Sequence, residues 1–406
     1  MTAVTLADVE AARERHRETD AVRRTECQRN RTLSAMLDAD VHPKLEHLQR
    51  TGSFKPRGAY NAIRLLADRG EAERVVAASV GNHAQGVALA ATEVGLPSTV
   101  VMPESAPQTK IDATEGYGAE VVLHGSAFPA AMAHAKTLAE APGTALVHAF
   151  DDPAVVAGQG TIGLEIAEQV PDVDTVVVPV GGGGLIGGIG VALAAAVPDA
   201  RLVAVQADAA ATLPRSLEKG APVDLEDPAT IADGIATGGI SELTYGLIEE
   251  HVDEVVTVTD DEIAASSLVL YERTKQIVEG AGAASVAACF GDDLDVTGET
   301  VVPVLSGGNI DMSMLQTVLT YALADRGQLV HLRVRIADRP GKMEAIAGRI
   351  AETGANIRNV RHDRAVGGLH VGEAFLVFEV VTGGSGHAEA VIEAIAEGGY
   401  HVERVN

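Results

Sequence analysis

The chain has 406 residues, of which 46% are hydrophobic, and its formal net charge is −26. This length exceeds that of a usual single domain, and the apolar content is enough for more than one core. A strongly negative protein repels phosphate backbones and anionic lipids, so the composition excludes nucleic acid and membrane surfaces as expected partners. With 57 Asp plus Glu against 31 Lys plus Arg, we interpret the surface as adapted to high salt; an ordinary acidic protein is the alternative.

The two cysteines, Cys27 and Cys289, are too few for a disulfide framework or a cysteine-based metal site. The N-terminal segment is charged and helix-like, which predicts no signal peptide. The most apolar run, 176–199, is interrupted by seven glycines and two prolines, so no membrane span is predicted. We therefore expect a soluble, cytoplasmic protein without a metal site.

Short apolar runs alternate with alanine-rich helical stretches through the first three quarters of the chain. Each run is continuously apolar, as expected for parallel strands that are covered on both faces. The predicted strands are 74–79, 98–103, 120–125, 175–180, 201–206 and 300–308. The pattern indicates an α/β fold with two parallel layers, in which a small subdomain at about 50–150 is inserted in a larger one. We expect a ligand cleft where the strand C-termini meet the helix N-termini.

The pattern changes at about residue 328. QLVHLRVRIAD alternates between polar and apolar residues, and PGKMEAIAGRIAETG reads as an amphipathic helix that Pro340 opens. Two further strands, a helix at 386–398 and a final strand follow. The order βαββαβ predicts a separate ferredoxin-like domain at 328–406.

Four consecutive glycines, Gly181 to Gly184, lie between a predicted strand and a helix that starts near Leu185. Glycines in such a turn let backbone N–H groups point at one anion, and the helix dipole adds to their attraction. The spacing matches neither a P-loop nor a dinucleotide-binding loop. The run indicates a site for a single phosphate group; a tight structural turn is the alternative.

Two other strand ends carry polar groups. SVGNH follows the strand at 74–79, where Ser79, Asn82 and His83 are suited to holding a carboxylate; a helix N-cap is the alternative. SGGN, which starts at Ser306, ends the strand at 300–308. Because ligand sites in open α/β sheets occupy this edge, the three motifs together predict one site.

Lys55 lies in TGSFKPRG, directly after Phe54, in a chain that has 7 lysines. An amine, a single-phosphate site and a hydroxyl group are together the parts needed to hold pyridoxal phosphate as a Schiff base, with Ser306 facing the ring nitrogen. A lysine in a surface salt bridge is the alternative.

The motifs TGSFKPRGAYN, SVGNHAQGVA, GGGGLIGG and SGGN occur in this order. In them the chain resembles the threonine and serine dehydratases, which are fold type II (tryptophan-synthase-β-like) pyridoxal phosphate enzymes, over about residues 5–320. The C-terminal unit resembles an ACT domain, and the pairing resembles the single-ACT threonine ammonia-lyases. The resemblance implies a catalytic domain at 1–325, an ACT regulatory domain at 328–406, and a homo-oligomer, either a dimer or a tetramer.

The resemblance also implies residue roles. Lys55 would carry the cofactor and take the α-proton, Asn82 would contact the ring hydroxyl, and Ser306 the ring nitrogen. The other cofactor-binding residues implied are Phe54, Gly181, Gly182, Gly183, Gly184, Leu185 and Glu279. The implied substrate-binding residues are Ser53, Ser79, Gly81, Asn82 and His83. The turns of the ACT unit that would bind an amino-acid effector carry Asp338, Gly341 and Asn356; ordinary turns and caps are the alternative.

The implied reaction is β-elimination of L-threonine, and of L-serine, to 2-oxobutanoate (pyruvate from serine) and ammonia, in isoleucine biosynthesis or in threonine breakdown. In serine racemases the corresponding motif resembles SSGNH. Val80 takes the place of its second serine here, so we expect poor racemisation. Gln206 stands where those enzymes have an acidic metal ligand, so no metal is expected. The alternatives are a serine or 3-hydroxyaspartate dehydratase, a β-replacement enzyme, and a non-catalytic amino-acid sensor.

Overall fold

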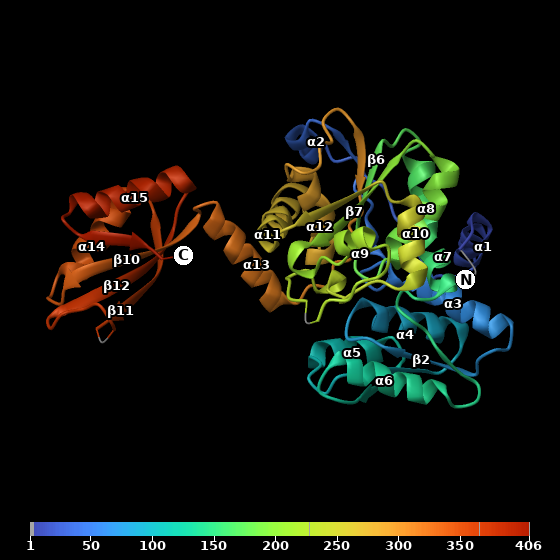
Figure 1. Ribbon diagram of the computed structural model, residues 1–406. Helices are drawn as coiled ribbons and strands as arrows, with labels where there is room; N and C mark the ends of the chain where they lie inside the picture. Colours follow the sequence, from blue (N-terminus) through green and yellow to red (C-terminus); the bar gives the residue numbers. More distant parts are fainter. Residues whose placement is uncertain (1–3, 227, 365, 406) are drawn as a thin grey trace. The chain divides into compact units, whose positions relative to one another are not determined.

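Two parallel sheets and one antiparallel sheet make up the protein, each with helices packed on it (Figure 1). The computed structural model describes residues 4–226, 228–364 and 366–405. The chain divides into two compact units, Met1–Asp311 and Met312–Asn406. The sequence predicted this division at 325–328, but it lies after Asp311. Helix α13 (Met312–Asp325) therefore belongs to the second unit, in which Arg404 donates to the Ala324 carbonyl at 2.8 Å.

The larger sheet of the first unit has the order β1-β9-β6-β7-β8, and all of its strands are parallel. Val176 and Val178 of β6 pack in one core with helix α8, while Val177 packs in another core with α12. Helices therefore cover both faces, which explains why β6 is continuously apolar. The strands are β1 (Asp40–Val41), β6 (Thr175–Pro179), β7 (Arg201–Ala207), β8 (Glu254–Val258) and β9 (Thr300–Pro303).

The smaller sheet of this unit has the order β4-β3-β2-β5 and is also parallel. Val75 and Ala77 of β2 pack with helices α3 and α4, and Val76 and Ala78 pack with α6 on the opposite face. This sheet is the predicted small subdomain. Its strands are β2 (Arg74–Ala78), β3 (Ser98–Met102), β4 (Glu120–Leu123) and β5 (Thr144–Leu146).

Among the described residues of the first unit, twelve helices connect and cover these strands, and four one-turn segments lie between them. The helices are α1 (Leu6–Arg17), α2 (Arg31–Leu37), α3 (Lys55–Asp68), α4 (Asn82–Val94), α5 (Gln108–Gly116), α6 (Phe128–Ala139), α7 (Pro153–Gln169), α8 (Gly184–Ala196), α9 (Leu213–Lys219), α10 (Glu242–His251), α11 (Asp260–Val269) and α12 (Gly280–Phe290). The short segments are η1 (Glu46–Leu48), η2 (Asp208–Ala210), η3 (Asp233–Ile235) and η4 (Leu270–Thr274).

The C-terminal unit contains an antiparallel sheet of order β11-β12-β10-β13 with two helices packed against it. Helix α14 begins at Lys342, two residues after Pro340, because Gly341 caps it with a φ of 86°. The elements follow the predicted βαββαβ order. They are β10 (Leu329–Ala337), α14 (Lys342–Glu352), β11 (Asn356–Asp363), β12 (Glu373–Val381), α15 (Ser385–Glu397) and β13 (His401–Arg404).

The fold class predicted from the sequence is confirmed. All six predicted strands of the first unit form, but the sequence missed β1, β5 and β8. Strands β1 and β5 are only two and three residues long, so neither has an apolar run that could be recognised. Within the described ranges, no helix combines the length and the apolar character that a membrane span requires.

A balanced cluster of four buried charges lies beneath the first turn of α3. Arg57 pairs with Glu46 at 2.8 Å and with Glu165 at 2.7 Å, and Glu165 also pairs with Lys44 at 2.6 Å. Arg57, Lys44 and Glu46 are fully buried. Burial raises the pKa of Glu165, but the charges of Arg57 and Lys44 outweigh it and lower that pKa to about 2. The cluster joins η1, α3 and α7 through ionised groups.

Replacing Arg57 by methionine should lower the free energy of unfolding by about 3–5 kcal/mol, because it leaves the buried Glu46 carboxylate without its cationic partner and Glu165 with Lys44 alone. Urea denaturation followed by circular dichroism measures the change. The matched control is Arg64→Met on the same helix, where an exposed pair with Asp68 is lost and the change should stay below about 1 kcal/mol. Equal losses in the two variants would contradict the importance of the cluster.

Candidate cofactor site

Three loops of the first unit meet at the N-terminus of α3. The Phe54 amide donates to the Ser306 carbonyl at 3.1 Å, and the Gly308 amide donates to the Gly52 carbonyl at 2.8 Å. The Glu279 amide donates to the Gly307 carbonyl at 3.0 Å. The predicted motifs TGSFK and SGGN therefore lie side by side, and the N-terminus of α12 lies beside them.

Lys55 is the first residue of α3, and its side chain is partly buried. Its Nζ donates to the Ala149 carbonyl at 3.3 Å and lies 4.9 Å from the centre of the Phe54 ring. Burial lowers the pKa of this amine from 10.5 to about 8, against the opposing charge of Glu279. A lysine with this pKa is partly unprotonated near neutral pH, as a nucleophile and a proton acceptor require.

Asn82 and Glu279 form a polar pair next to Lys55. The Asn82 Nδ2 donates to Glu279 Oε1 at 2.8 Å, and the Asn82 Oδ1 accepts from Asn309 Nδ2 at 2.8 Å. Glu279 is 9% exposed, and burial raises the pKa of its carboxyl, although the hydrogen bond from Asn82 opposes the change. The structure thus brings together Lys55, Asn82 and Glu279, for which the resemblance implies roles in cofactor binding; those roles stay predictions.

The side chains of the SVGNH segment differ in their hydrogen-bond partners. The Ser79 Oγ accepts from the Gly81 amide at 3.1 Å, which keeps the hydroxyl at the start of α4. His83 is buried, and its Nε2 donates to the Val147 carbonyl at 2.9 Å. Burial lowers the pKa of His83 to about 3, so the ring is neutral and adds no positive charge for a substrate carboxylate.

The glycine run joins β6 to α8, which begins at Gly184. Gly183 has a φ of 85°, a left-handed conformation that glycine adopts without strain. A Cβ on Gly182 would overlap the ring of Phe150, whose neighbour Ala149 accepts the hydrogen bond of Lys55. The first backbone N–H groups of α8 have no partner within the helix and can bind an anion. Leu185 is buried in the core behind them.

The site also contains hydroxyl groups without a partner. The Oγ of Ser53 and the Oγ1 of Thr51 are buried and have no hydrogen bond among the described residues. Ser306 is 3% exposed and begins SGGN in the loop that follows β9. Unpaired buried hydroxyls are costly, and a polar ligand can satisfy them. An amine, a glycine turn at a helix N-terminus and free hydroxyls fit pyridoxal phosphate, which carries an aldehyde, a phosphate and a polar ring.

The three residues proposed for effector binding lie at the turns of the C-terminal unit. Asp338 accepts from Arg364 Nε at 2.8 Å, and this pairing lowers the pKa of its carboxyl. Gly341 caps α14, and Asn356 is the first residue of β11. Asp338 and Gly341 are thus also explained by an ordinary turn and a helix cap, and Asn356 begins a strand, so the effector role stays a prediction.

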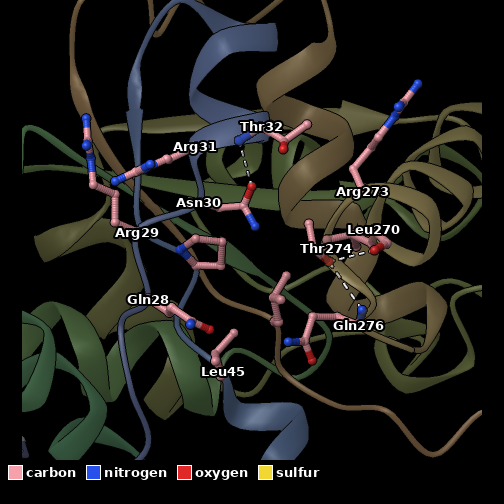
Figure 2. Close-up of a pocket in the computed structure, with 12 residues that line it drawn as sticks. Gln28, Arg29, Asn30, Arg31, Thr32, Leu45, Leu270, Arg273, Thr274 and Gln276 are labelled. Atoms are coloured by element: carbon pink, nitrogen blue, oxygen red, sulfur yellow. Dashed lines mark hydrogen bonds between the residues drawn. The ribbon is translucent and has the colours of Figure 1, made fainter.

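A separate pocket of about 200 Å³ is lined mainly by residues of the segments 28–32 and 270–276 (Figure 2). None of the described residues predicted for the site lines it, although Leu305, which does, precedes Ser306. Figure 2 shows Arg29 and Arg31 on one side and Arg273 on the other, and the side chain of Arg273 points away from the other two. The guanidinium groups therefore do not converge on one anion.

Sequence reasoning missed four contributors to the site. Ala149 and Phe150 lie beside Lys55 and the glycine run, but they follow an unpredicted strand and belong to no recognised motif. Asn309 was noted only as part of SGGN, and Lys110 was not considered; Lys110 Nζ lies 3.2 Å from the Asn309 carbonyl. Their partners are about 200 residues away in the chain, so only the fold reveals these contacts.

Comparisons with known proteins agree with this chemistry. Residues 18–307 match the family model described as "Pyridoxal-phosphate dependent enzyme". The chain is 42% identical over 402 residues to an L-threonine ammonia-lyase from Thermotoga maritima, covering 99% of this chain and 100% of that protein. Threonine deaminase isoform 2 from Solanum lycopersicum aligns with a TM-score of 0.73 at 36% identity, covering 79% of this chain and 90% of that one. Maize serine racemase aligns with a TM-score of 0.74 at 32% identity, covering 80% and 99% respectively.

Substituting Gly182 by alanine should weaken pyridoxal phosphate binding about tenfold or more, because overpacking against Phe150 displaces the loop that faces Lys55. Titration of the cofactor-free protein, followed by absorbance, gives the affinity. Gly246→Ala is the matched control, since a Cβ there meets no atom within 4 Å. Unchanged affinity in Gly182→Ala would show that the close packing at this glycine is unimportant for the site.

The pKa of Lys55 predicts the pH dependence of cofactor attachment. Only the unprotonated amine reacts with an aldehyde, so the attachment rate should rise with pH with a midpoint near the pKa of about 8. Glu279→Gln removes a charge that raises this pKa, so the midpoint should move to lower pH. Stopped-flow absorbance measures the rates, with the exposed Glu104→Gln as control. A midpoint at the ordinary lysine value of 10.5 would contradict the burial of the amine.

Proposed function

Because the chain belongs to the family of pyridoxal-phosphate-dependent enzymes, we propose that it is an L-threonine ammonia-lyase that also accepts L-serine. The observation that carries the proposal is the environment of Lys55: a partly buried amine of lowered pKa lies beside Asn82, Glu279 and SGGN. Similarity over the whole chain to the Thermotoga maritima ammonia-lyase supports the choice of substrate.

Pyridoxal phosphate supplies an electron sink for the electron pair that remains when the α-proton of an amino acid is removed. In this proposal Lys55 would hold the cofactor through its Nζ, and the same amine would accept the α-proton of the substrate. An amine pKa of about 8 suits this exchange, because both protonation states are populated near neutral pH.

The surrounding residues would orient cofactor and substrate. The amide of Asn82 would contact the ring hydroxyl, and Ser306 would bind the ring nitrogen. Gly181 to Gly184, with Leu185, would hold the phosphate, and Phe54 would pack near the ring. The hydroxyls of Ser53 and Ser79 and the backbone at Gly81 would bind the substrate carboxylate. A hydroxyl at the ring nitrogen does not protonate it, which favours elimination over reactions that need a long-lived carbanion.

The net reaction balances as a loss of ammonia. The Cα–H and Cβ–O bonds of threonine break, and the electron pair of the former becomes the new double bond as hydroxide leaves with a proton. The enamine product tautomerises to an imine, and water hydrolyses it to 2-oxobutanoate and ammonia. The water lost in the first step is regained in the last, so no oxidant is needed.

Val80 argues against racemisation as the main activity. A racemase must deliver a proton to the face of the substrate opposite the lysine, and Val80 has no proton to give. Maize serine racemase has a similar fold, so the architecture alone does not distinguish the two activities.

The C-terminal βαββαβ unit supports a further part of the proposal, namely that an amino-acid effector controls the enzyme through an ACT domain. Its sheet order and its turns at Asp338, Gly341 and Asn356 are suited to this role. The proposal includes a homo-oligomer, since ACT sheets pair, and a place in isoleucine biosynthesis. The acidic surface supports activity at high salt.

Release of 2-oxo acid from L-threonine, L-serine and threo-3-hydroxyaspartate tests the function. L-threonine should be the best substrate, and Lys55→Ala should lose essentially all turnover because the amine is removed. Repeating the assay at high salt and with added isoleucine tests the salt adaptation and the effector. D-amino acid formation should be minor.

Two outcomes would contradict the proposal. If the protein binds pyridoxal phosphate but turns over none of the three substrates, it is a sensor or acts on another β-substituted amino acid. If 3-hydroxyaspartate or serine is turned over much faster than threonine, the chain is a dehydratase, but L-threonine is not its main substrate.

A further inference from the structure

Asn309 connects the two layers of the first unit at the candidate site. It follows SGG in the loop after β9 of the larger sheet, and its Nδ2 donates to the Thr51 carbonyl at 2.6 Å. The same Nδ2 donates to Oδ1 of Asn82 at 2.8 Å, and Asn82 begins α4 on the smaller sheet. Asn309 is thus bound to both layers, and its side chain joins the SGGN loop to the SVGNH loop.

The bond from Asn309 decides how the amide of Asn82 is turned. Because Asn309 presents an N–H donor, the oxygen of the Asn82 amide must face it, and the NH2 group must face the opposite way. That NH2 group donates to Glu279 Oε1 at 2.8 Å and has a second N–H available. The reversed amide would place two oxygens together at Glu279, which is unfavourable.

The backbone packs tightly around Asn309. Gly52 has a φ of 74°, and a Cβ there would lie 2.5 Å from Oδ1 of Asn309, so a side chain at this position would displace the amide. The Gly308 amide donates to the Gly52 carbonyl at 2.8 Å on the adjoining turn. The amide of Asn309 therefore has little freedom to rotate.

Lys110 holds the same residue from the side of the small sheet. It lies on α5, and its Nζ donates to the Asn309 carbonyl at 3.2 Å and pairs with Asp311 Oδ1 at 3.4 Å. Its side chain is only 19% exposed, so this cation is partly removed from water. Lys110 is one of seven lysines in the chain, and it links α5 of the smaller layer to the loop after β9 of the larger layer.

We propose that Asn309 and Lys110 are positioning residues that fix the amide of Asn82 with its NH2 group toward Glu279 and the cofactor site. Asn309 does so through its side chain, and Lys110 does so by holding the Asn309 backbone across the two layers. Neither residue needs to touch the substrate. The inference rests on the proposed cofactor site, but not on the identity of the substrate.

The first test compares pyridoxal phosphate binding in Asn309→Asp and in the parent. Aspartate keeps the shape of the side chain but removes both N–H donors, so it repels Oδ1 of Asn82. We expect the Kd to rise about 10- to 100-fold, in line with the loss of a hydrogen bond at a charged site. The absorbance band of the bound cofactor should shift as well. Parent affinity and an unchanged spectrum would overturn the proposal.

The second test uses Lys110, whose replacement leaves the side chains of the site intact. Lys110→Met should raise the Kd about 3- to 30-fold, whereas Lys110→Arg, which can still donate to the carbonyl and pair with Asp311, should stay within about twofold of the parent. Lys219→Met, an exposed lysine on α9, is the matched control and should have no effect. Equal effects of Lys110→Met and Lys110→Arg would contradict the role of the cation.

A double variant shows whether Lys110 acts through Asn309. If it does, Lys110→Met combined with Asn309→Asp should bind pyridoxal phosphate no more weakly than Asn309→Asp alone. Fully additive effects would show that Lys110 acts by another route and would overturn that part of the proposal. These measurements need no substrate, so they stand apart from the threonine assay. With a substrate, kcat should fall more than KM changes, because Asn82 orients the cofactor rather than the substrate side chain.

Discussion

The buried charge cluster of Arg57, Glu46, Glu165 and Lys44 fixes the part of the fold on which the site depends. Helix α3 starts at Lys55 without a side-chain cap, so its first turn needs another support. Arg57 supplies it two residues later by binding η1 and α7 at once. These ion pairs hold the backbone of the first turn in place. The Lys55 amine therefore stays buried, and burial keeps its pKa low.

From this fixed turn the site extends by backbone contacts to loops of both sheets. SGGN is bound to Phe54 and Gly52, and through Asn309 it reaches α4 and α5 of the small sheet. The carboxyl edges of the two parallel sheets thus supply different groups to one place. This arrangement gives each sheet a separate task, since one contributes SVGNH and Lys110 and the other contributes the glycine run and Glu279.

The sequence predicted the layers because β2, β3, β6, β7 and β9 are continuously apolar, and this pattern is typical of parallel strands that helices cover on both faces. It also predicted which loops carry polar groups, since glycines and hydroxyls are concentrated at strand ends. The contacts between loops could not be predicted, because a hydrogen bond from Asn309 to Asn82 depends on the packing of two sheets. The glycine run shows the same limit: Phe150 fills the space beside Gly182, so packing as well as anion binding accounts for the glycine there.

The net charge of −26 is at first sight unsuited to a site for a phosphate and an amino-acid carboxylate. At 0.1 M salt, however, charges more than about 10 Å apart are largely screened, and at 1 M the distance falls to about 3 Å. In the proposed site the anions then respond to the nearest groups, which are Lys55 and the backbone N–H groups that begin α8. A protein with an acidic surface can therefore bind anionic ligands at high salt, provided that positive groups are placed where the ligands bind, as the Lys55 amine and the N-terminus of α8 are in the proposed site.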